Sequence, residues 1–270
     1  MEQEIIHTFL VLAYKESPYL ENAVKSVLNQ EYPSKVVIGT STDNEYIRSI
    51  ADKYHLDVIV NPVKNGGNTG DFDFGWSHGN NTIVTIAHQD DFYDPGYSKH
   101  IVEAYRKHPD SIIIFTDYYE IRNDKRVYHN LLLNVKKTLL LPLSIVKSSE
   151  NKSMKQSCLR FGTAICCPAV SYVPSNIPFD KVFRQDEFVG VADWYGWYKL
   201  SNVDNTSFTY IPKPLMGHRV HEGSHTSREI HSDIRSKQEL EMFKKFWPEG
   251  FAKFLNHFYR KAQYSNELKK

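Results

Sequence analysis

The stretch TIVTIAHQDDFYDP, residues 82–95, joins an apolar run to an acidic end. Residues 82–87 have the composition of a strand that is buried on both faces. The run ends at His88-Gln89-Asp90-Asp91, and Asp94-Pro95 then opens a helix with apolar residues along one side. Because ligands bind at the carboxyl ends of the strands in open α/β sheets, the stretch predicts a binding site at residues 88–91.

Strand and helix patterns alternate on both sides of this stretch. The first helix is expected to begin with Ser17 as its N-cap and Pro18 at its first position, and Asp43 is expected to cap the second. This alternation implies a Rossmann-like α/β fold, with a mostly parallel sheet and helices on both faces. The expected strands cover residues 5–13, 35–40, 57–60, 82–87 and 111–116.

The pattern changes after Asp117, where the regular alternation stops. We expect a hairpin from residues 118–121 and 126–128, partly helical structure over 131–165, a late strand over 208–211, and helices from Ser232 to the end with a break at Pro248-Glu249-Gly250. The chain is thus expected to form one domain over residues 1–230, with a nucleotide-type half (1–117) and a second half (118–230), and a helical extension over 231–270.

The composition is that of an ordinary globular protein. Of the 270 residues, 41% are hydrophobic and 24% are charged, which argues against a disordered or fibrous chain. The net charge is +1, so no general binding to nucleic acid is expected. Three cysteines without a CxxC motif do not suggest a disulfide framework, and neither a basic leader nor a long apolar run is seen. We therefore expect a cytoplasmic location.

Asp90 and Asp91 are candidates for holding a metal ion. Hard divalent cations such as Mg²⁺ or Mn²⁺ take oxygen ligands, usually one or two carboxylates together with substrate phosphates. The alternative is that both are surface acids of a loop, with Asp94 a simple helix cap. Their position at the end of a buried strand favours the metal site.

Four motifs in order resemble those of family 2 glycosyltransferases with the GT-A fold. They are residues 9–20 continuing into 23–30, residues 88–95, residues 191–200, and residues 218–227. The resemblance spans about residues 5–230, which would be the GT-A domain, with its acceptor and catalytic half over 118–230. It implies the inverting transfer of a sugar from a nucleotide-diphosphate donor to a hydroxyl, in glycan or cell-surface polysaccharide synthesis.

The resemblance also implies roles for three carboxylates. Asp91, helped by Asp90, would hold Mn²⁺ or Mg²⁺, which offsets the charge of the leaving diphosphate. Asp193 would be the general base for the acceptor hydroxyl, a role that typically supplies about 10²–10⁴ in rate. From the residues alone, Asp193 could equally cap a helix that opens at Trp194.

The remaining donor contacts are assigned by the same resemblance, and three departures bear on them. The chain has no acid directly after its second strand, no arginine at Gly70-Asp71-Phe72, and His88 in place of the first acid of the DxD motif. Base recognition would therefore pass to other groups, and Tyr14 either stacks on the base or lies in the core. The expected donor-binding residues are Ala13, Tyr14, Glu16, Thr40, Ser41, Asp71, Gln89, Asp90, His218 and His221.

Two other functions stay open. A nucleotidyltransferase would also use strand-end carboxylates, but residues 13–18 lack the glycine-rich loop expected of it. A catalytically inactive GT-A-like module that binds nucleotide sugars is compatible with the departures. The acceptor is expected to be a glycan or a lipid-linked molecule.

The basic, aromatic segment 242–261 allows two interpretations. It could form a helix that lies on an anionic membrane on the cytoplasmic face. The alternative is an ordinary helix that docks Phe251, Leu255 and Phe258 on the core with its lysines outside, which is the usual case for such a stripe.

Overall fold

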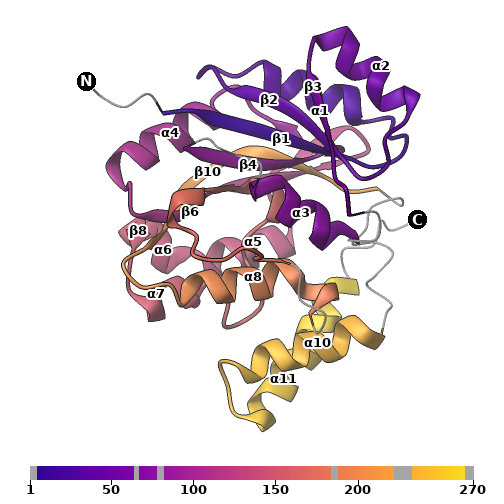
Figure 1. Ribbon diagram of the computed structural model, residues 1–270. Coiled ribbons are helices and arrows are strands. Elements are labelled where there is room, and N and C mark those ends of the chain that lie inside the picture. The colour runs from indigo at the N-terminus through magenta and orange to yellow at the C-terminus, as the bar shows by residue number, and fades with distance from the viewer. Residues whose placement is uncertain (1–4, 64–66, 78–81, 184–187, 222–232, 265–270) are drawn as a thin grey trace.

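The computed structural model describes residues 5–63, 67–77, 82–183, 188–221 and 233–264 (Figure 1). Its centre is a ten-stranded sheet in the order β3-β2-β1-β4-β9-β6-β10-β5, with β7 paired to β6 and β8 to β10. The strands are β1 (His7–Ala13), β2 (Lys35–Thr40), β3 (Asp57–Val60), β4 (Ile83–His88), β5 (Phe92–Tyr93), β6 (Ser111–Arg122), β7 (Lys125–Val127), β8 (Ser148–Ser149), β9 (Val170–Tyr172) and β10 (Ser207–Arg219).

Helices connect these strands and cover both faces of the sheet (Figure 1). The α-helices are α1 (Leu20–Leu28), α2 (Glu45–Tyr54), α3 (Gly67–Ser77), α4 (Tyr97–Lys107), α5 (Leu131–Leu139), α6 (Leu141–Val146), α7 (Lys152–Ser157), α8 (Ala192–Ser201), α10 (Asp233–Lys244) and α11 (Glu249–Tyr264). Short 3₁₀ turns are η1 (Cys167–Ala169), η2 (Pro174–Asn176) and η3 (Val189–Val191).

The first half of the chain forms a parallel sheet, as its alternating pattern predicts. β1 pairs in parallel with both β2 and β4, and β2 pairs in parallel with β3. Within this register Leu12 of β1 lies opposite His88, the last residue of β4. The carboxyl ends of neighbouring strands therefore meet at one edge, and the acidic turn after β4 lies there. The α/β fold class and the helices on both faces are confirmed.

Two hydrophobic clusters follow from the alternation of side chains along the strands. In β1, Phe9 and Val11 belong to a cluster that includes apolar residues of α1, α2 and α4. The opposite cluster is formed mainly by α3, α6, α8 and the C-terminal helices, with Trp194 and Trp197 of α8 fully buried. The long apolar run of the first strand is thus explained by burial on both faces.

Both predicted helix caps are wrong by one or two residues. Helix α1 begins at Leu20 with Tyr19 as its N-cap, because Ser17 accepts a hydrogen bond from the Leu20 N–H (3.2 Å) in a turn before the helix. Asn44 caps α2, since its Oδ1 accepts a hydrogen bond from the Ile47 N–H (2.9 Å). Asp43 instead forms an ion pair with Arg48.

β6 and β10 are much longer than predicted. β6 runs through Asp117, where the pattern changes, and then forms the predicted hairpin with β7. β10 extends the expected strand to Arg219 and pairs in parallel with β6 over most of its length. The extension matters because it carries residues 218 and 219 to the edge of the sheet that holds the acidic turn.

The C-terminal helices pack on helix α8 through an apolar contact. The rings of Trp194 and Phe243 lie 5.0 Å apart, and Ala252 of α11 is fully buried. A break between two helices is present, but it covers residues 245–248, and of the predicted residues only Pro248 lies in it, because Glu249 and Gly250 begin α11. Among the helices that the structure describes, none has both the length and the apolar character needed to cross a membrane.

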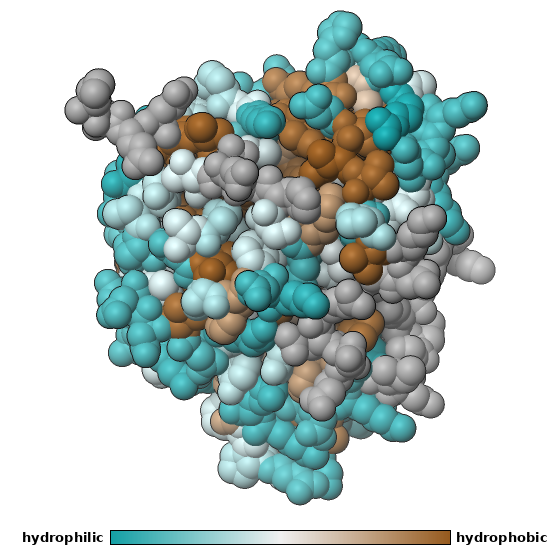
Figure 2. Space-filling view, in the orientation of Figure 1, coloured by the Kyte–Doolittle hydropathy of each residue, from teal (hydrophilic) through white to brown (hydrophobic). Residues whose placement is uncertain are grey.

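The expected docking of Phe251 and Phe258 on the core is wrong. Their exposed fractions are 43% and 54%, and that of Phe254 between them is 55%. Helix α11 contacts the core through Ala252, with Leu255 partly buried, so the phenylalanines lie on another face of the helix. The side of α10 and α11 that is visible in Figure 2 is mainly hydrophilic, with small hydrophobic areas.

Candidate active site

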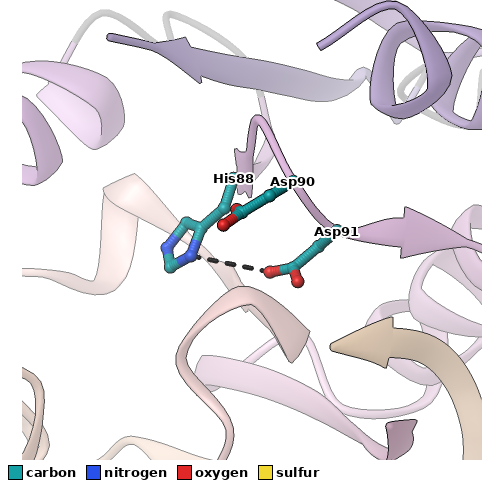
Figure 3. Close-up of side chains that lie close together, drawn as sticks. All are labelled: His88, Asp90 and Asp91. Carbon is teal, nitrogen blue, oxygen red and sulfur yellow. Dashed lines mark ion pairs between the residues drawn. The ribbon is translucent and has the colours of Figure 1, made fainter. Parts of the chain in front are cut away.

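The turn between β4 and β5 brings His88, Asp90 and Asp91 together (Figure 3). Three potential metal-ligand atoms, one from each side chain, lie within 4.8 Å of one another. The Asp91 side chain is 0% exposed, whereas His88 and Asp90 are partly open to solvent. Within the described residues this is the one group of at least three histidines, cysteines or acids close enough to hold a metal ion.

Residues at the end of β10 hold the Asp91 carboxylate from one side. Its Oδ1 accepts a hydrogen bond from the Arg219 N–H (2.9 Å) and lies 3.1 Å from His218 Nδ1. β10 passes close to β6 here, and a Cβ atom at Gly217 would lie 2.6 Å from the Tyr119 ring. Glycine is therefore required at that position for the strand to reach the turn.

The other side of this carboxylate is free to bind a ligand. Among the residues that the structure describes, neither Asp91 Oδ2 nor His88 Nε2 has a hydrogen-bond partner, and both atoms are buried. Asp91 Oδ2 lies 3.6 Å from His88 Nδ1, the pair that is dashed in Figure 3. A buried polar atom without a partner costs about 1–3 kcal/mol, and carboxylate oxygen and imidazole nitrogen are both ligands of Mn²⁺. The residues present therefore fit a divalent cation.

Aromatic and cationic neighbours fix the rest of the turn. The His88 ring stacks on Phe72 of α3, with centroids 5.3 Å apart and planes 10° from parallel. The Arg219 Nε donates to the Asp90 carbonyl (3.1 Å), its Nη1 pairs with Asp124 (2.8 Å), and its guanidinium lies over the Tyr19 ring (4.5 Å). Arg219 and Phe72 were not predicted as site residues; Arg219 lies beside His218 in the quoted motif, which is the signal that could have pointed to it.

Asp90 and three histidines form a cluster of ionisable groups at the same place. Asp90 Oδ2 lies 2.8 Å from His221 Nε2. Burial alone would raise the pKa of Asp90, but the hydrogen bond to His221 and the nearby imidazoles of His88 and His218 outweigh it and hold the pKa below its usual value. Desolvation would lower the pKa of His218, but the charge and hydrogen bond of Asp91 outweigh it and raise the pKa.

The loop after β1 is joined to the acidic turn through Gln89. The Tyr14 N–H donates to Gln89 Oε1 (2.9 Å), and Gln89 Nε2 donates to the Tyr14 carbonyl (3.3 Å). The Tyr14 side chain is 48% exposed, so its alternative role as a core residue is wrong. Glu16 is also exposed, and Ala13 is buried as the last residue of β1.

A second polar cluster lies at the ends of β2 and β3. Ser41 Oγ donates to Asp71 Oδ2 (3.0 Å), and Asn61 Nδ2 donates to Asp71 Oδ1 (2.9 Å). Thr40 is buried, and its Oγ1 accepts from the Thr42 N–H (3.0 Å). Asn61 was not predicted; its place directly after the strand of residues 57–60 is the signal that could have found it.

Asp73, also on α3, joins the two halves of the chain. Its Oδ1 accepts hydrogen bonds from the N–H groups of Val182 (2.7 Å) and Phe183 (2.9 Å) and from Trp76 Nε1 (3.0 Å). The carboxylate is buried, so these charge-assisted bonds hold residues 182–183, which precede α8 in the chain, against α3.

Asp193 lies in the first turn of α8 and is partly exposed. The helix begins at Ala192 instead of Trp194, and Asp193 Oδ1 accepts from the Trp194 N–H (2.7 Å). Desolvation raises the pKa of the Cys166 and Cys167 thiols well above the usual value, and the charges of both Asp193 and Asp91 raise it further. The charges of the two carboxylates therefore act on the same pair of thiols.

Comparisons with known proteins agree with this geometry. The sequence model described as Glycosyl transferase family 2 matches residues 8–172, more than half of the 270 residues. No curated protein matches the sequence.

Similar solved structures include TarS of S. aureus and a mannosyltransferase. TarS 1–349 in complex with UDP-GlcNAc is 14% identical with a TM-score of 0.66, over 98% of this chain and 76% of that chain. The mannosyltransferase PcManGT from Pyrobaculum calidifontis, in complex with GDP-Man and Mn²⁺, is 13% identical with a TM-score of 0.63, over 98% and 73%. A longer TarS structure has a TM-score of 0.61 at 14% identity; this chain covers only 44% of it.

These likenesses show the fold, and the family match shows the class. The mostly parallel sheet, with the acidic turn at its carboxyl edge, is that of the GT-A glycosyltransferases. The chain belongs to glycosyl transferase family 2 and is a glycosyltransferase.

Proposed function

We propose that this protein transfers a sugar from a nucleotide-diphosphate donor to an acceptor hydroxyl, with inversion at the anomeric carbon and with a divalent cation at Asp91. The observation that carries the proposal is the Asp91 carboxylate: Oδ1 is held by the end of β10, while the buried Oδ2 has no hydrogen-bond partner within the described part of the chain. Leaving such an atom unsatisfied costs free energy, and a bound cation would remove that cost. The Mn²⁺ and nucleotide sugars bound by the structural neighbours support the same conclusion.

Asp91, with Asp90 and His88, would hold the cation. When bound, Mn²⁺ or Mg²⁺ offsets the negative charge that builds on the leaving diphosphate. His218 and His221 contact Asp91 and Asp90 from the side of β10, and we propose that their imidazoles also meet the phosphates of the donor. Imidazole donors suit this task because they bind phosphate without displacing the carboxylates.

The donor nucleoside would bind between the loop after β1 and the ends of β2 and β3. Tyr14 offers an exposed ring for stacking, in a loop whose backbone is held by Gln89. Ser41 and Asn61 position the Asp71 carboxylate, which can accept hydrogen bonds from a base or a ribose. Ala13, Glu16 and Thr40 would line this region.

Asp193 would act as the general base. It accepts the proton of the acceptor hydroxyl while that oxygen forms a bond to the anomeric carbon and the nucleoside diphosphate departs from the opposite face. A single displacement of this kind inverts the configuration of the carbon. The partial exposure of Asp193 suits a base that must meet an incoming acceptor.

We propose a glycan or lipid-linked acceptor of cell-surface polysaccharide synthesis, reached at the cytoplasmic face of a membrane. An aromatic surface supports the membrane contact: Trp247 lies 5.0 Å from Phe251, Phe251 5.9 Å from Phe254, and Phe254 4.7 Å from Phe258. Lys253 and Arg260 lie on the same helix, so an anionic lipid surface matches both its apolar and its charged side chains.

Vesicle sedimentation tests this contact. The wild type should sediment with phosphatidylglycerol vesicles and much less with phosphatidylcholine vesicles. The double variant F254S/F258S should lose most of this binding, while its affinity for nucleotides stays unchanged. Equal sedimentation of the variant and the wild type would remove α11 from the membrane contact.

A thermal-shift panel tests the donor site. UDP, GDP, dTDP and CDP would be added with and without Mn²⁺, because a ligand of the native state raises the melting temperature by mass action. We expect one nucleotide to give a shift that depends on Mn²⁺ and that Asp91→Asn abolishes. Transfer from the matching nucleotide sugar then distinguishes an enzyme from an inactive binding module. No shift with any nucleotide would contradict the proposal.

A further inference from the structure

Two consecutive lysines on α5 have different surroundings. Lys137 Nζ lies 3.5 Å from Asp117 Oδ2 and donates to the Tyr128 carbonyl (3.3 Å). Among the residues that the structure describes, Lys136 has no carboxylate at ion-pair distance; its Nζ lies 5.2 Å from the centroid of the Tyr118 ring. Lys136 thus keeps its hydrogen-bonding capacity, whereas Lys137 is already neutralised.

Lys136 belongs to a chain of contacts that ends at the metal turn. The edge of the Tyr118 ring meets His218, with centroids 6.3 Å apart and planes at 73°. His218 Nδ1 in turn lies 3.1 Å from Asp91 Oδ1. The four residues come from α5, β6, β10 and the turn after β4, so the fold itself brings the lysine toward the site.

The electrostatic influence of Lys136 reaches the same region. Desolvation raises the pKa of Cys166, and Lys136 is the charge that most opposes this rise. Asp91 and Asp193 act on the same thiol. The charge of Lys136 therefore acts on the same thiol as the charges of both proposed catalytic carboxylates, in agreement with the chain of contacts through Tyr118 and His218.

The site contains several negative charges, and Lys136 is a cation close to them. Asp90, Asp91 and Asp193 are acidic, and the Arg219 guanidinium is already engaged by Asp124 and the Asp90 carbonyl. A phosphate group entering next to these acids would meet the metal ion and the imidazoles of His218 and His221, and a permanent positive charge would strengthen its binding further. Lysine is well suited, because it binds phosphate as a point charge with three donors.

We propose that Lys136 binds a phosphate group of a substrate, either the diphosphate of the donor or a phosphate carried by the acceptor. The inference rests on the proposed function. If the inference is correct, the positive charge that binds phosphate in this protein comes from α5, since residues 70–72 of α3 carry no positive charge.

The test uses Lys136→Met, which removes the charge and keeps the stem, with Lys136→Arg and Lys137→Met as matched controls. Affinities for UDP and GDP with Mn²⁺, and for the parent nucleosides, are measured by calorimetry. A second arm measures the affinity for inorganic phosphate, using protein that is already saturated with whichever nucleotide binds. Circular dichroism checks that each variant is folded.

In the donor arm, Lys136→Met should weaken nucleoside diphosphate binding by roughly 10-fold or more, the loss expected for a hydrogen bond to a charged group, and leave nucleoside binding unchanged. Lys136→Arg should retain most of the affinity, and Lys137→Met should match the wild type. A loss confined to inorganic phosphate would assign Lys136 to the acceptor phosphate instead.

Normal nucleotide binding by the wild type, with no loss for Lys136→Met in either arm, overturns this inference alone. If the wild type binds no nucleotide with Mn²⁺, the proposed function fails, and the inference falls with it.

Discussion

Asp91 and Asp193 are both carboxylates near the carboxyl edge of the sheet, but the fold treats them differently. Asp91 is fully buried, and two residues of β10 hold one of its oxygens. Asp193 is partly exposed, and its Oδ1 accepts a hydrogen bond from the N–H of Trp194, the next residue in its own helix. One carboxylate is positioned by distant parts of the chain, the other by its immediate neighbours.

The difference teaches what each position requires. A metal ligand must be in place before the substrate arrives, because the geometry of the cation depends on it. A general base must release and accept a proton next to an incoming acceptor, so solvent access and a local anchor suffice. The predictions below test whether this division of tasks is correct.

The largest expected effect follows from Asp91→Asn. Loss of the metal ligand should reduce transfer by about 10⁴-fold, because the cation supplies several kcal/mol of stabilisation to the leaving diphosphate. Metal-dependent binding of the nucleoside diphosphate should disappear in calorimetry. If the variant still binds the nucleotide with Mn²⁺ at wild-type affinity, Asp91 is not the metal ligand and the proposed difference between the two carboxylates is wrong.

Asp193→Asn should affect chemistry and spare binding. We expect transfer to fall by about 10³-fold, within the range of a lost general base. The affinity for the nucleoside diphosphate with Mn²⁺ should stay within about twofold of the wild type, and calorimetry under the same conditions checks it. A large loss of nucleotide affinity would show that Asp193 belongs to the donor site instead.

Asp73→Ala tests the connection between the two halves. Three buried donors lose their acceptor, so the free energy of unfolding should fall by about 3 kcal/mol in urea titrations. Asp43→Ala, which removes an exposed ion pair with Arg48, is the control and should change little. Equal stability of both variants would mean that the contact of α3 with residues 182–183 is not needed.

Arg219→Met should give the smallest effect. The backbone N–H of residue 219 still holds Asp91, so the losses are the support of Asp90, the stacking on Tyr19 and the exposed ion pair with Asp124. We expect the KM for the donor to rise about tenfold with little change in kcat. The variant Asp124→Asn removes only the ion pair with Arg219. Its KM for the donor should stay within about twofold of the wild-type value, because Asp124 is 90% exposed.

The sequence predicted the first half of the fold well because each strand there is a short apolar run followed by a helical stripe. β2 and β3 have the predicted bounds, and the acidic turn lies where the end of the fourth strand indicated. The helix starts were missed because spacing does not reveal which group caps a helix. Ser17 accepts through its backbone carbonyl in a turn before α1, and the side chain of Asn44 caps α2 while that of Asp43 pairs with Arg48.

The site was predicted in part for a similar reason. Asp90, Asp91, His218 and His221 do come together. Arg219 was missed, since its importance depends on contacts with a turn about 130 residues earlier in the chain. Asn61 was missed although it lies directly after the third strand and contacts Asp71 only ten residues away. The length of β10 was underestimated because Pro212 and Pro214 interrupt its strand pattern, while its pairing with β6 continues past register shifts at these residues.

The partners that hold Asp90 and Asp91 lie 127 to 131 residues further along the chain. Contacts of such long sequence separation close a large loop and form late in folding. During synthesis, a nascent chain that ends before β10 contains the whole acidic turn but lacks the residues that hold Asp90 and Asp91 in place. Donor binding therefore cannot assist the early steps of folding, and the first molecule able to bind the nucleotide is one whose sheet is already complete.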